Sequence, residues 1–422
     1  KDEDSDFGVV LPVAGEVGKS YQLTVEYSGD GALLDAGGGN FFLLPRSTWY
    51  PNNASAAFGD RALFDLKFHY PKGYILIGVG ALVEPERPEG DSIASHWTSG
   101  QIELQVAGFN YGRFKKNEEM DVPSGYNIEY YANTELPNEV RMMQLQIEQA
   151  EARGETTGTT LGAMTTTAMA KTAIGETENA MRIYNAYFGK LPFTRIAMSQ
   201  QPAGFFGQAW PTLVFMPYTA FLDSTQRVQM FGIRGGTNNF WTFVGPHEVS
   251  HQWWGHAVGW TSYHDQWMSE GFAEFSTSIY AQFVKKDLGK FNDLWTRQRE
   301  LITETNPRTG KKPYTVGPVT QGYRLNSAKT GNVARAMIYP KGAYILQMIR
   351  MMMLDHRDGT GDKQFILMMK DFVQSHLNQD ASTEDFKAIV EKYMTPGMDV
   401  DKNKSMNWFF DEWVYGTDVP AY

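Results

Sequence analysis

Two histidines four residues apart, with one glutamate between them and another further along, constrain this chain more than any other feature. His247, Glu248 and His251 fall in one short segment, and Glu270 follows after 18 intervening residues (252–269). Residues i and i+4 lie on one face of an α-helix, so both imidazoles can reach a single metal ion. Two imidazoles and one carboxylate are the protein ligands of a catalytic zinc site with an open position for water. The spacing therefore predicts two neighbouring helices that hold one Zn²⁺ ion.

The residues around this pattern indicate how it could work. Gly245 and Pro246 are expected to open the first helix, since proline is tolerated in a first helical turn. The second helix is expected to begin near Gln266 and to carry Glu270. Zinc lowers the pKa of bound water toward about 7, so a carboxylate near the open position can take its proton. The pattern predicts metal-assisted hydrolysis, with Glu248 as general base and then general acid.

Three further ionisable residues lie close to the pattern in the sequence. His256 and His264 are expected to support the site or to lie at the surface, because three protein ligands are already accounted for. Glu274, one helical turn after Glu270, could orient a ligand imidazole. A solvent-facing carboxylate is the more frequent role, and it is the expectation for Glu274.

Composition limits the class of protein. With 422 residues the chain is long enough for two domains. A hydrophobic content of 42% and an aromatic content of 14% predict globular domains with large cores. The net charge of −10 disfavours nucleic acid and anionic membranes as partners. No run of about 18 apolar residues occurs, so no transmembrane segment is expected.

The start of the chain and its cysteine content bear on location. The chain begins at Lys1 with an acidic stretch and no initiator methionine, so either an export signal has been removed or the chain is part of a longer protein. The absence of cysteine excludes thiolate ligands and a disulfide scaffold. We expect an extracytoplasmic location, either periplasmic or secreted.

The first third of the chain has the pattern of β-structure. Up to residue 136, apolar and polar residues alternate between Gly, Pro, Asn and Asp, which predicts an antiparallel β domain. Clear examples are Tyr21–Tyr27, Leu63–Tyr70 and Gln101–Val106. The apolar run Tyr74–Val83 predicts a buried strand.

Helical patterns dominate after that point. Residues 137–167 are expected to form a connector, with helix formers at Val140–Glu151 and then a Gly/Thr-rich stretch. A long helix is predicted from Met169 to Phe188. Short strands are predicted at Phe193–Met198 and Thr212–Met216. Further helices are predicted near residues 245–257, 267–286, 340–355, 362–376 and 383–394.

Four segments resemble the aminopeptidase N-like family of zinc metallopeptidases, in the gluzincin clan. His247–Gly255 reads HEVSHQWWG where the family has H-E-x-x-H-Q-W-[FW]-G, and Trp267–Ala273 reads WMSEGFA where the family has W-x-[NS]-E-G-F-A. Tyr339–Ala343 matches Y-x-K-G-A, and Asn407–Gly416 is similar to the last helix of the family's catalytic domain. The resemblance covers Tyr184–Tyr422 and extends only loosely over the β domain.

The resemblance implies a fold and a reaction. The fold would be α+β, with an N-terminal antiparallel β domain at 1–136 and a thermolysin-like, mainly helical domain with a small β-sheet at 137–422. The reaction would be zinc-dependent hydrolysis of a peptide or protein substrate. Tyr339, expected just ahead of a helix that starts at Pro340, would donate its hydroxyl to the oxyanion that forms on the attacked carbonyl.

One segment departs from the family pattern. The family carries G-[AG]-M-E-N, whose glutamate holds the free α-amino group of the substrate. Gly207, Gln208 and Ala209 occupy this region, with Ala209 at the place of the glutamate. A methyl group cannot pair with an ammonium ion, so altered anchoring of the free amine is expected. The three residues stay candidates for substrate binding, because the strand edge at Pro211–Met216 could pair with an extended peptide.

A protein of another class would use the same fold without catalysis. Function depends on the site and not on the fold, so a catalytically idle, peptidase-like binding or assembly subunit of a larger complex is the alternative. Retention of all five positions, His247, Glu248, His251, Glu270 and Tyr339, favours the enzyme.

Overall fold

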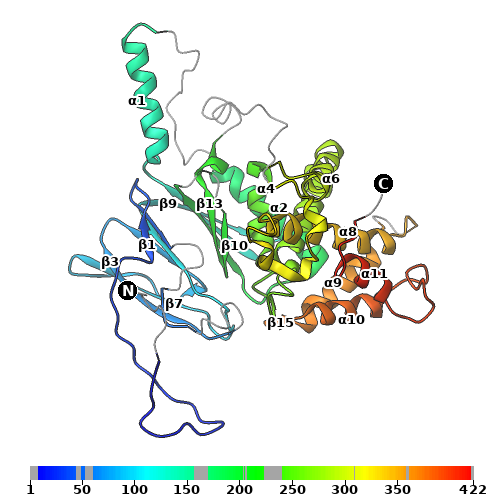
Figure 1. The fold of residues 1–422 in the computed structure, drawn as a ribbon. Helices are drawn as coiled ribbons and strands as arrows, with labels where there is room; N and C mark the ends of the chain where they lie inside the picture. The colour runs from blue at the N-terminus through cyan, green and yellow to red at the C-terminus, as the bar shows by residue number, and fades with distance from the viewer. Residues whose placement is uncertain are drawn as a thin grey trace.

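The structure is a computed structural model (Figure 1). It describes residues 8–43, 49–52, 60–155, 170–202, 204, 207–222, 240–307, 309–357 and 361–419. The part of the predicted connector at residues 156–167 lies outside this set.

Two antiparallel sheets form the N-terminal region. The first has the order β1-β2-β8-β4 and the second β3-β7-β5, with β6 also paired to β7. Their strands are β1 (Leu33–Asp35), β2 (Asn40–Leu43), β3 (Asp65–Pro71), β4 (Ile75–Gly78), β5 (Ala81–Leu82), β6 (Arg87–Glu89), β7 (Ser92–Thr98) and β8 (Phe109–Gly112). The prediction of an antiparallel β region is confirmed.

Some predicted strands in this region are wrong. Tyr21–Tyr27 forms no strand, and its apolar side chains are exposed, because no described strand lies beside it to pair with. Gln101–Val106 makes only a single bridge, at Leu104. Tyr74–Val83 is divided into β4 and β5 by Gly80, whose φ of +76° turns the chain. A side chain at Gly80 would also meet the Thr98 carbonyl oxygen at 2.1 Å.

A five-stranded mixed sheet lies at the centre of the molecule (Figure 1). Its order is β12 (Gln208–Trp210), β13 (Leu213–Pro217), β11 (Arg195–Gln201), β10 (Tyr126–Asn133) and β9 (Phe114–Asp121). The inner pairs β10·β11 and β11·β13 are parallel, and the two outer pairs are antiparallel. The sheet therefore contains strands from both sides of residue 136, and the division into domains there stays a prediction.

Each face of this sheet belongs to a different hydrophobic core. Side chains of Ile128, Ile196 and Val214 pack with the helices, whereas Ala197 and Phe215 pack with the N-terminal sheets. Because successive residues of a strand point to opposite faces, one set of strands supports both cores.

The rest of the chain is mainly helical. The α-helices are α1 (Asn138–Ala152), α2 (Ala170–Phe188), α4 (Phe240–Ser250), α5 (Trp267–Ile279), α6 (Leu288–Thr303), α7 (Ala334–Ala336), α8 (Gly342–Met353), α9 (Lys363–Ser375), α10 (Thr383–Tyr393) and α11 (Asn407–Trp413). Shorter helical turns are η2 (Tyr218–Phe221), η3 (Tyr280–Lys285), η4 (Pro313–Thr315), η5 (Val319–Leu325) and η6 (Met337–Lys341). A small parallel sheet pairs β14 (Val258–Trp260) with β15 (Gln379–Ala381). No helix in the described ranges is both long and apolar enough to span a bilayer.

Helix limits differ from prediction near the metal-ligand pattern. Pro246 lies inside α4 and does not open it, because Phe243 and Val244 are buried and extend the helix ahead of the proline. The helix ends at Ser250 and does not continue to residue 257. Tyr339 lies inside the π-helical turn η6, and not ahead of a helix that starts at Pro340.

Candidate active site

Helices α4 and α5 position the predicted metal ligands, and the side chain of Trp254, just after α4, packs against α5. His247 lies on α4 and His251 directly after it, while Glu270 lies on α5. Trp254 packs edge-on against Phe272 of α5 with ring centroids 5.2 Å apart. Its indole N–H also donates to Ser276 Oγ at 3.0 Å. These contacts fix the position of α5 relative to the end of α4.

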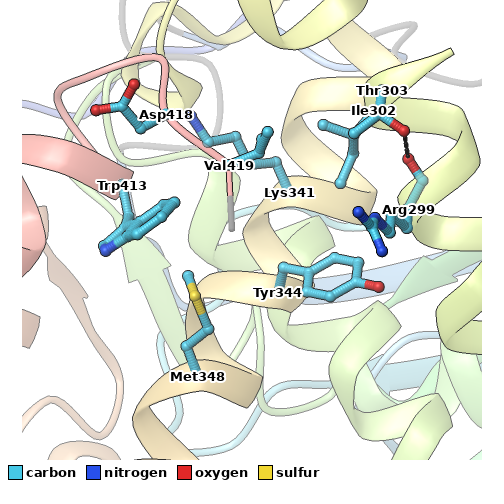
Figure 2. Close-up of a pocket in the computed structure, with 9 residues that line it drawn as sticks. All are labelled: Arg299, Ile302, Thr303, Lys341, Tyr344, Met348, Trp413, Asp418 and Val419. Atoms are coloured by element: carbon cyan, nitrogen blue, oxygen red, sulfur yellow. Dashed lines mark hydrogen bonds between the residues drawn. The ribbon is translucent and has the colours of Figure 1, made fainter. Parts of the chain in front are cut away.

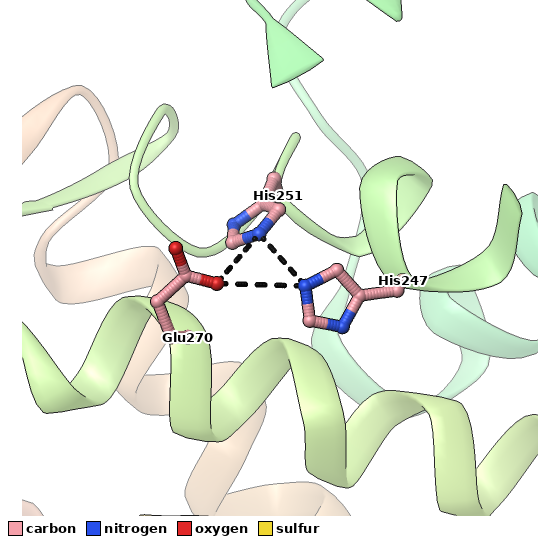
Figure 3. A group of neighbouring side chains, drawn as sticks. All are labelled: His247, His251 and Glu270. Carbon is pink, nitrogen blue, oxygen red and sulfur yellow. Dashed lines mark hydrogen bonds and ion pairs between the residues drawn. The ribbon is translucent and has the colours of Figure 1, made fainter. Parts of the chain in front are cut away.

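Three atoms converge on one point (Figure 3). The Nε2 atoms of His247 and His251 are 3.3 Å apart. Glu270 Oε2 lies 3.4 Å from the first of these atoms and 3.2 Å from the second. Atoms bound at about 2.0–2.2 Å around a tetrahedral zinc ion are about 3.3–3.6 Å apart. The spacing of the three atoms agrees with that figure to within a few tenths of an ångström.

The outer nitrogens of both rings have acceptors as partners. His247 Nδ1 lies 3.2 Å from Glu274 Oε2, and His251 Nδ1 lies 2.9 Å from the Trp254 carbonyl oxygen. An ionised carboxylate and a carbonyl only accept, so each Nδ1 carries a proton, and a ring that loses its other proton has its lone pair at Nε2. The buried Oε2 of Glu270 has no hydrogen-bond partner. When both rings are neutral, three lone-pair atoms face one another, an arrangement that a bound cation stabilises by taking the place of the proton.

Three carboxylates surround the candidate metal-binding position and give it a strongly negative electrostatic potential. Burial disfavours a charged imidazole, but Glu270, Glu274 and Glu248 outweigh it and raise the pKa of His247 to about 10. Burial also disfavours the Glu270 carboxylate, yet His251 and His247 hold its pKa well below the usual range. The carboxylate is therefore ionised at neutral pH, as a metal ligand must be.

Glu248 lies beside the three atoms and is 8% exposed. Burial raises the pKa of its carboxyl, with a smaller contribution from Glu270, against the opposite effect of His247, His251 and Arg335. Gly207 leaves room for this carboxylate, since a Cβ there would lie 2.3 Å from Glu248 Oε1. The structure thus provides a buried carboxylate of increased basicity next to the candidate metal ligands.

The side chain of Tyr339, on η6, lies next to the candidate metal ligands His247 and Glu270. Its ring lies parallel to the ring of His247, with centroids 6.0 Å apart and an interplanar angle of 5°. Burial raises the pKa of its hydroxyl well above the ordinary value, and Glu270 and Tyr323 raise it further. The guanidinium of Arg335 lies 5.2 Å from the centre of the Tyr339 ring. The hydroxyl therefore stays protonated and can donate.

A glycine contact explains how Tyr339 reaches the site. Gly271 follows Glu270 on α5, and Gly342 begins α8 directly after η6. A Cβ on Gly271 would lie 2.7 Å from Gly342 Cα, and a Cβ on Gly342 would lie 2.9 Å from Gly271 Cα. Only two glycines permit so close a crossing, which places Tyr339 beside Glu270.

Known proteins are similar to this chain in sequence and in fold. Residues 237–413 match the family model described as the peptidase family M1 domain. This stretch of the chain is therefore similar to an M1 peptidase domain. The resemblance to the aminopeptidase N-like family is confirmed, and the match supports a hydrolase of the zinc metallopeptidase class.

Curated relatives match this chain over short stretches. The chain is 26% identical over 146 residues to glutamyl aminopeptidase of Bos taurus, which is 35% of this chain and 14% of that protein. It is 29% identical over 109 residues to aminopeptidase Ey of Gallus gallus, 24% of this chain and 10% of that protein. The matched segments thus span only a small part of either relative.

Solved structures share the fold over most of the chain. An M1 zinc metallopeptidase from Deinococcus radiodurans has a TM-score of 0.59 at 19% identity, over 91% of this chain and 71% of the other. A two-domain M1 zinc metallopeptidase variant bound to L-arginine has a TM-score of 0.62 at 17% identity, over 94% and 75%. The predicted α+β fold of this chain is thus shared with these structures.

The other candidate site residues lie away from the three metal-ligand atoms. Gln208 and Ala209 lie on β12, at the edge of the central sheet, and Gly207 directly precedes it. His256 and His264 are not part of the three-ligand group found among the described residues. His264 Nδ1 lies 2.8 Å from the Thr320 carbonyl oxygen.

The solvent-facing role expected for Glu274 is wrong. Its carboxylate faces His247 Nδ1 and accepts a hydrogen bond from Gln298. The i+4 spacing from Glu270 was the signal in the sequence, because it places both carboxylates on one face of α5. Arg335 was missed, since only the tertiary structure brings it to the site, and the contacts of Gln252 with Trp210 and Thr212 were not predicted.

Lys341, from the segment Tyr339–Ala343, contacts the end of the segment Asn407–Gly416. Lys341 Nζ donates to the Gly416 carbonyl oxygen at 3.0 Å. Burial lowers the pKa of Lys341 to about 8, and Asp418 partly offsets this. The lysine lines a pocket together with Tyr344 and Trp413 (Figure 2). This contact joins η6 to the segment after α11, and so supports the position of Tyr339.

Proposed function

We propose that this chain hydrolyses peptide bonds with one zinc ion held by His247, His251 and Glu270. The observation that carries the proposal is the set of three lone-pair atoms, 3.2–3.4 Å apart, with a proton on the outer nitrogen of each imidazole. Bound zinc would act as a Lewis acid and lower the pKa of a bound water. The remaining steps belong to side chains of the protein.

Glu248 is the proposed general base. Its carboxylate takes a proton from the attacking water and passes it to the amine that leaves. Burial raises the pKa of this carboxyl and makes it a stronger base than an exposed glutamate. The close approach of Gly207 restricts where the carboxylate can lie.

Tyr339 is the proposed oxyanion donor. Its hydroxyl keeps its proton at neutral pH, because its pKa is raised well above the ordinary value. A pre-placed donor of this kind stabilises the tetrahedral transition state by about 3–4 kcal/mol.

The proposed substrate is an extended peptide paired with the edge strand β12. Strand addition uses the free backbone groups of such an edge. Gln208 and Ala209 carry no charge, so this stretch offers no ion pair to a free α-amine. Two relatives are aminopeptidases by name, and strict aminopeptidase action is the competing proposal. Equal hydrolysis of a free-amine peptide and its acetylated twin is expected, and strong preference for the free amine would favour the competing proposal.

A peptidase assay on purified, zinc-loaded protein tests the function. We expect hydrolysis that a chelator abolishes and added zinc restores. Glu248→Gln should retain zinc but lose roughly a thousandfold or more in kcat, and Tyr339→Phe about a hundredfold or more. Glu304→Gln, at an exposed glutamate after α6, is the control and should match the wild type.

The opposite result would identify a protein of another class. A stably folded preparation that binds no metal and cleaves no peptide would contradict the proposal. That outcome would favour a catalytically idle binding or assembly subunit.

A further inference from the structure

The edge strand β12 is held by the segment that follows the metal ligands. Gln252 donates from Nε2 to the Trp210 carbonyl oxygen at 3.0 Å and accepts at Oε1 from the Thr212 N–H at 2.8 Å. His256 Nε2 lies 3.2 Å from the Ala209 carbonyl oxygen. Glu248 lies against Gly207, just before the strand. Glu248, Gln252 and His256, four residues apart in the sequence, thus all contact β12 or the residues next to it.

The His256 ring donates to the strand. A carbonyl oxygen only accepts, so Nε2 must carry the proton. Nδ1 is buried and has no hydrogen-bond partner. Burial is the main cause that lowers the pKa of His256 to about 3, so the ring is neutral at physiological pH. The ring is therefore a fixed donor and carries no charge.

Arg61 from the N-terminal region fixes the backbone of the same residue. Its guanidinium donates to the His256 carbonyl oxygen at 3.1 Å and to Asn378 Oδ1 at 3.3 Å. It also pairs with Asp380 at 3.1 Å, where Gln105 donates to the same carboxylate oxygen at 2.7 Å. The Arg61 side chain is only 9% exposed. Hydrogen bonds thus fix both the backbone of His256, through Arg61, and its ring, through the Ala209 carbonyl.

The Ala209 carbonyl lies on the free side of β12. Ala209 pairs with Val214 of β13, yet its carbonyl oxygen bonds to His256 and to the Gln208 side-chain amide, the latter at 3.0 Å. Backbone groups alternate in direction along an antiparallel strand, so those of Gly207 face the same side as those of Ala209. Both acceptor positions of the Ala209 carbonyl are occupied. The Gly207 backbone forms no hydrogen bond with the residues that the structure describes, so it can pair with another strand.

We propose that His256 is a positioning residue that holds β12 through the Ala209 carbonyl, so that a substrate peptide pairs at Gly207, beside Glu248. The proposal rests on the proposed peptidase function. It identifies the substrate as a peptide in extended conformation that pairs through its backbone. Without the His256 donor, β12 would lose one of the hydrogen bonds that hold it, and the Gly207 backbone would be less well placed to pair with the peptide.

Hydrolysis of an internally quenched, alanine-rich hexapeptide by the zinc-loaded protein tests this role. For His256→Leu we expect KM to rise about tenfold, the effect of losing one hydrogen bond to the binding strand, with zinc content unchanged. His256→Gln keeps an N–H donor and should restore most of the affinity. His264→Leu is the matched control, because His264 binds a carbonyl of another segment, and its KM should be that of the wild type.

A binding measurement separates this proposal from the proposed function. Fluorescence anisotropy of a dansylated form of the hexapeptide, on zinc-loaded Glu248→Gln protein, needs no turnover. Adding His256→Leu to this background should raise Kd about tenfold, whether or not the wild type cleaves peptides. An unchanged Kd, an equal loss in His256→Gln, or loss of zinc together with affinity would each overturn the positioning role. Absence of cleavage by wild type, with the Kd difference intact, would contradict only the peptidase.

Discussion

Glu274 supports the metal site through one ring. Its carboxylate lies 3.2 Å from His247 Nδ1 and fixes both the orientation and the tautomer of that imidazole. We expect Glu274→Ala to weaken zinc affinity by about 10- to 100-fold, the usual effect of removing such a partner. Competition with a chelator of known affinity measures it. Glu300→Ala, at a surface glutamate of α6 that pairs with Arg297, is the control. A change of less than about twofold for Glu274→Ala would show that the contact does not matter.

Arg335 contributes to the pH dependence of the site. Its charge lowers the pKa of Glu248, whereas burial, the larger effect, raises it. A general base works only when ionised, so activity falls as the pH drops through that pKa. Arg335→Met removes the lowering effect, and the acidic limb of kcat/KM should move to higher pH. Arg324→Met, which removes a guanidinium that stacks on Tyr263, should leave the limb in place. An unmoved limb in Arg335→Met would contradict the argument.

Single residues were predictable where the signal was local. His247 and His251 are brought together because the i,i+4 relation needs only one helical turn, which α4 and its end provide. Glu270 needed the turn between two helices, and its spacing implied that turn. Arg335 and Gln252 could not be found in this way. Arg335 lies 88 residues after His247 (335 − 247), and Gln252 bonds to Trp210, 42 residues before it (252 − 210).

The crossing of α5 and α8 places the catalytic side chains relative to one another. Gly271→Ala puts a methyl group 2.7 Å from the Gly342 backbone, so the helices must separate. We expect a loss of about 1–3 kcal/mol in the free energy of unfolding and at least a tenfold loss in kcat, because Tyr339 moves with α8. Urea unfolding and steady-state kinetics measure the two effects.

A second helical glycine provides the control. A Cβ on Gly175 of α2 would have no other described atom within 4 Å, so Gly175→Ala should stabilise the helix by about 0.5–1 kcal/mol. Equal stability of Gly271→Ala and Gly175→Ala would contradict the role given to the crossing.

Elements were predicted better in type than in extent. Helices α2 and α10 follow the sequence pattern closely, because each buries one apolar face on its own length. The predicted start of α4 was wrong, since the burial of Phe243 and Val244 offsets the backbone hydrogen bond that Pro246 cannot make. Tyr21–Tyr27 has the alternation of a strand, but a strand also needs a neighbour, and alternation does not report one.

At the scale of the whole molecule, the N-terminal sheets and the helical region share the central sheet. Arg195 of β11 pairs with Glu129 at 2.7 Å and donates to the carbonyls of Gly78 and Gly80 at 3.2 and 3.0 Å. Both charged side chains are nearly buried, at 12% and 9% exposure. We expect Arg195→Leu to lower the free energy of unfolding by about 3–5 kcal/mol, because Glu129 is left buried and without this partner.

The form of the unfolding curve tests the shared core. Tryptophan fluorescence and zinc release should follow one transition in urea, and Arg195→Leu should shift both together. Arg87→Leu removes an exposed ion pair with Glu84 and should change stability by less than about 1 kcal/mol. Two separate transitions in the wild type would contradict a common core.

This architecture was only partly predictable. The antiparallel pattern before residue 136 and the helical pattern after it are local properties, and both regions are present. The pairing of β10 with β11 joins residues 127–131 to residues 195–199, and nothing in either segment specifies that partner. The division at residue 136 therefore reflects a change of pattern along the chain, while the sheet itself continues across it.

The central claim is that His247, His251 and Glu270 hold one metal ion. Anomalous diffraction at the zinc edge, from crystals of the protein purified without added chelator, tests it most directly. We predict one peak per chain, within about 2.0–2.2 Å of both Nε2 atoms and of a Glu270 carboxylate oxygen. A zinc-supplemented crystal with no peak among these three side chains, or with the two imidazoles turned apart, would contradict the account.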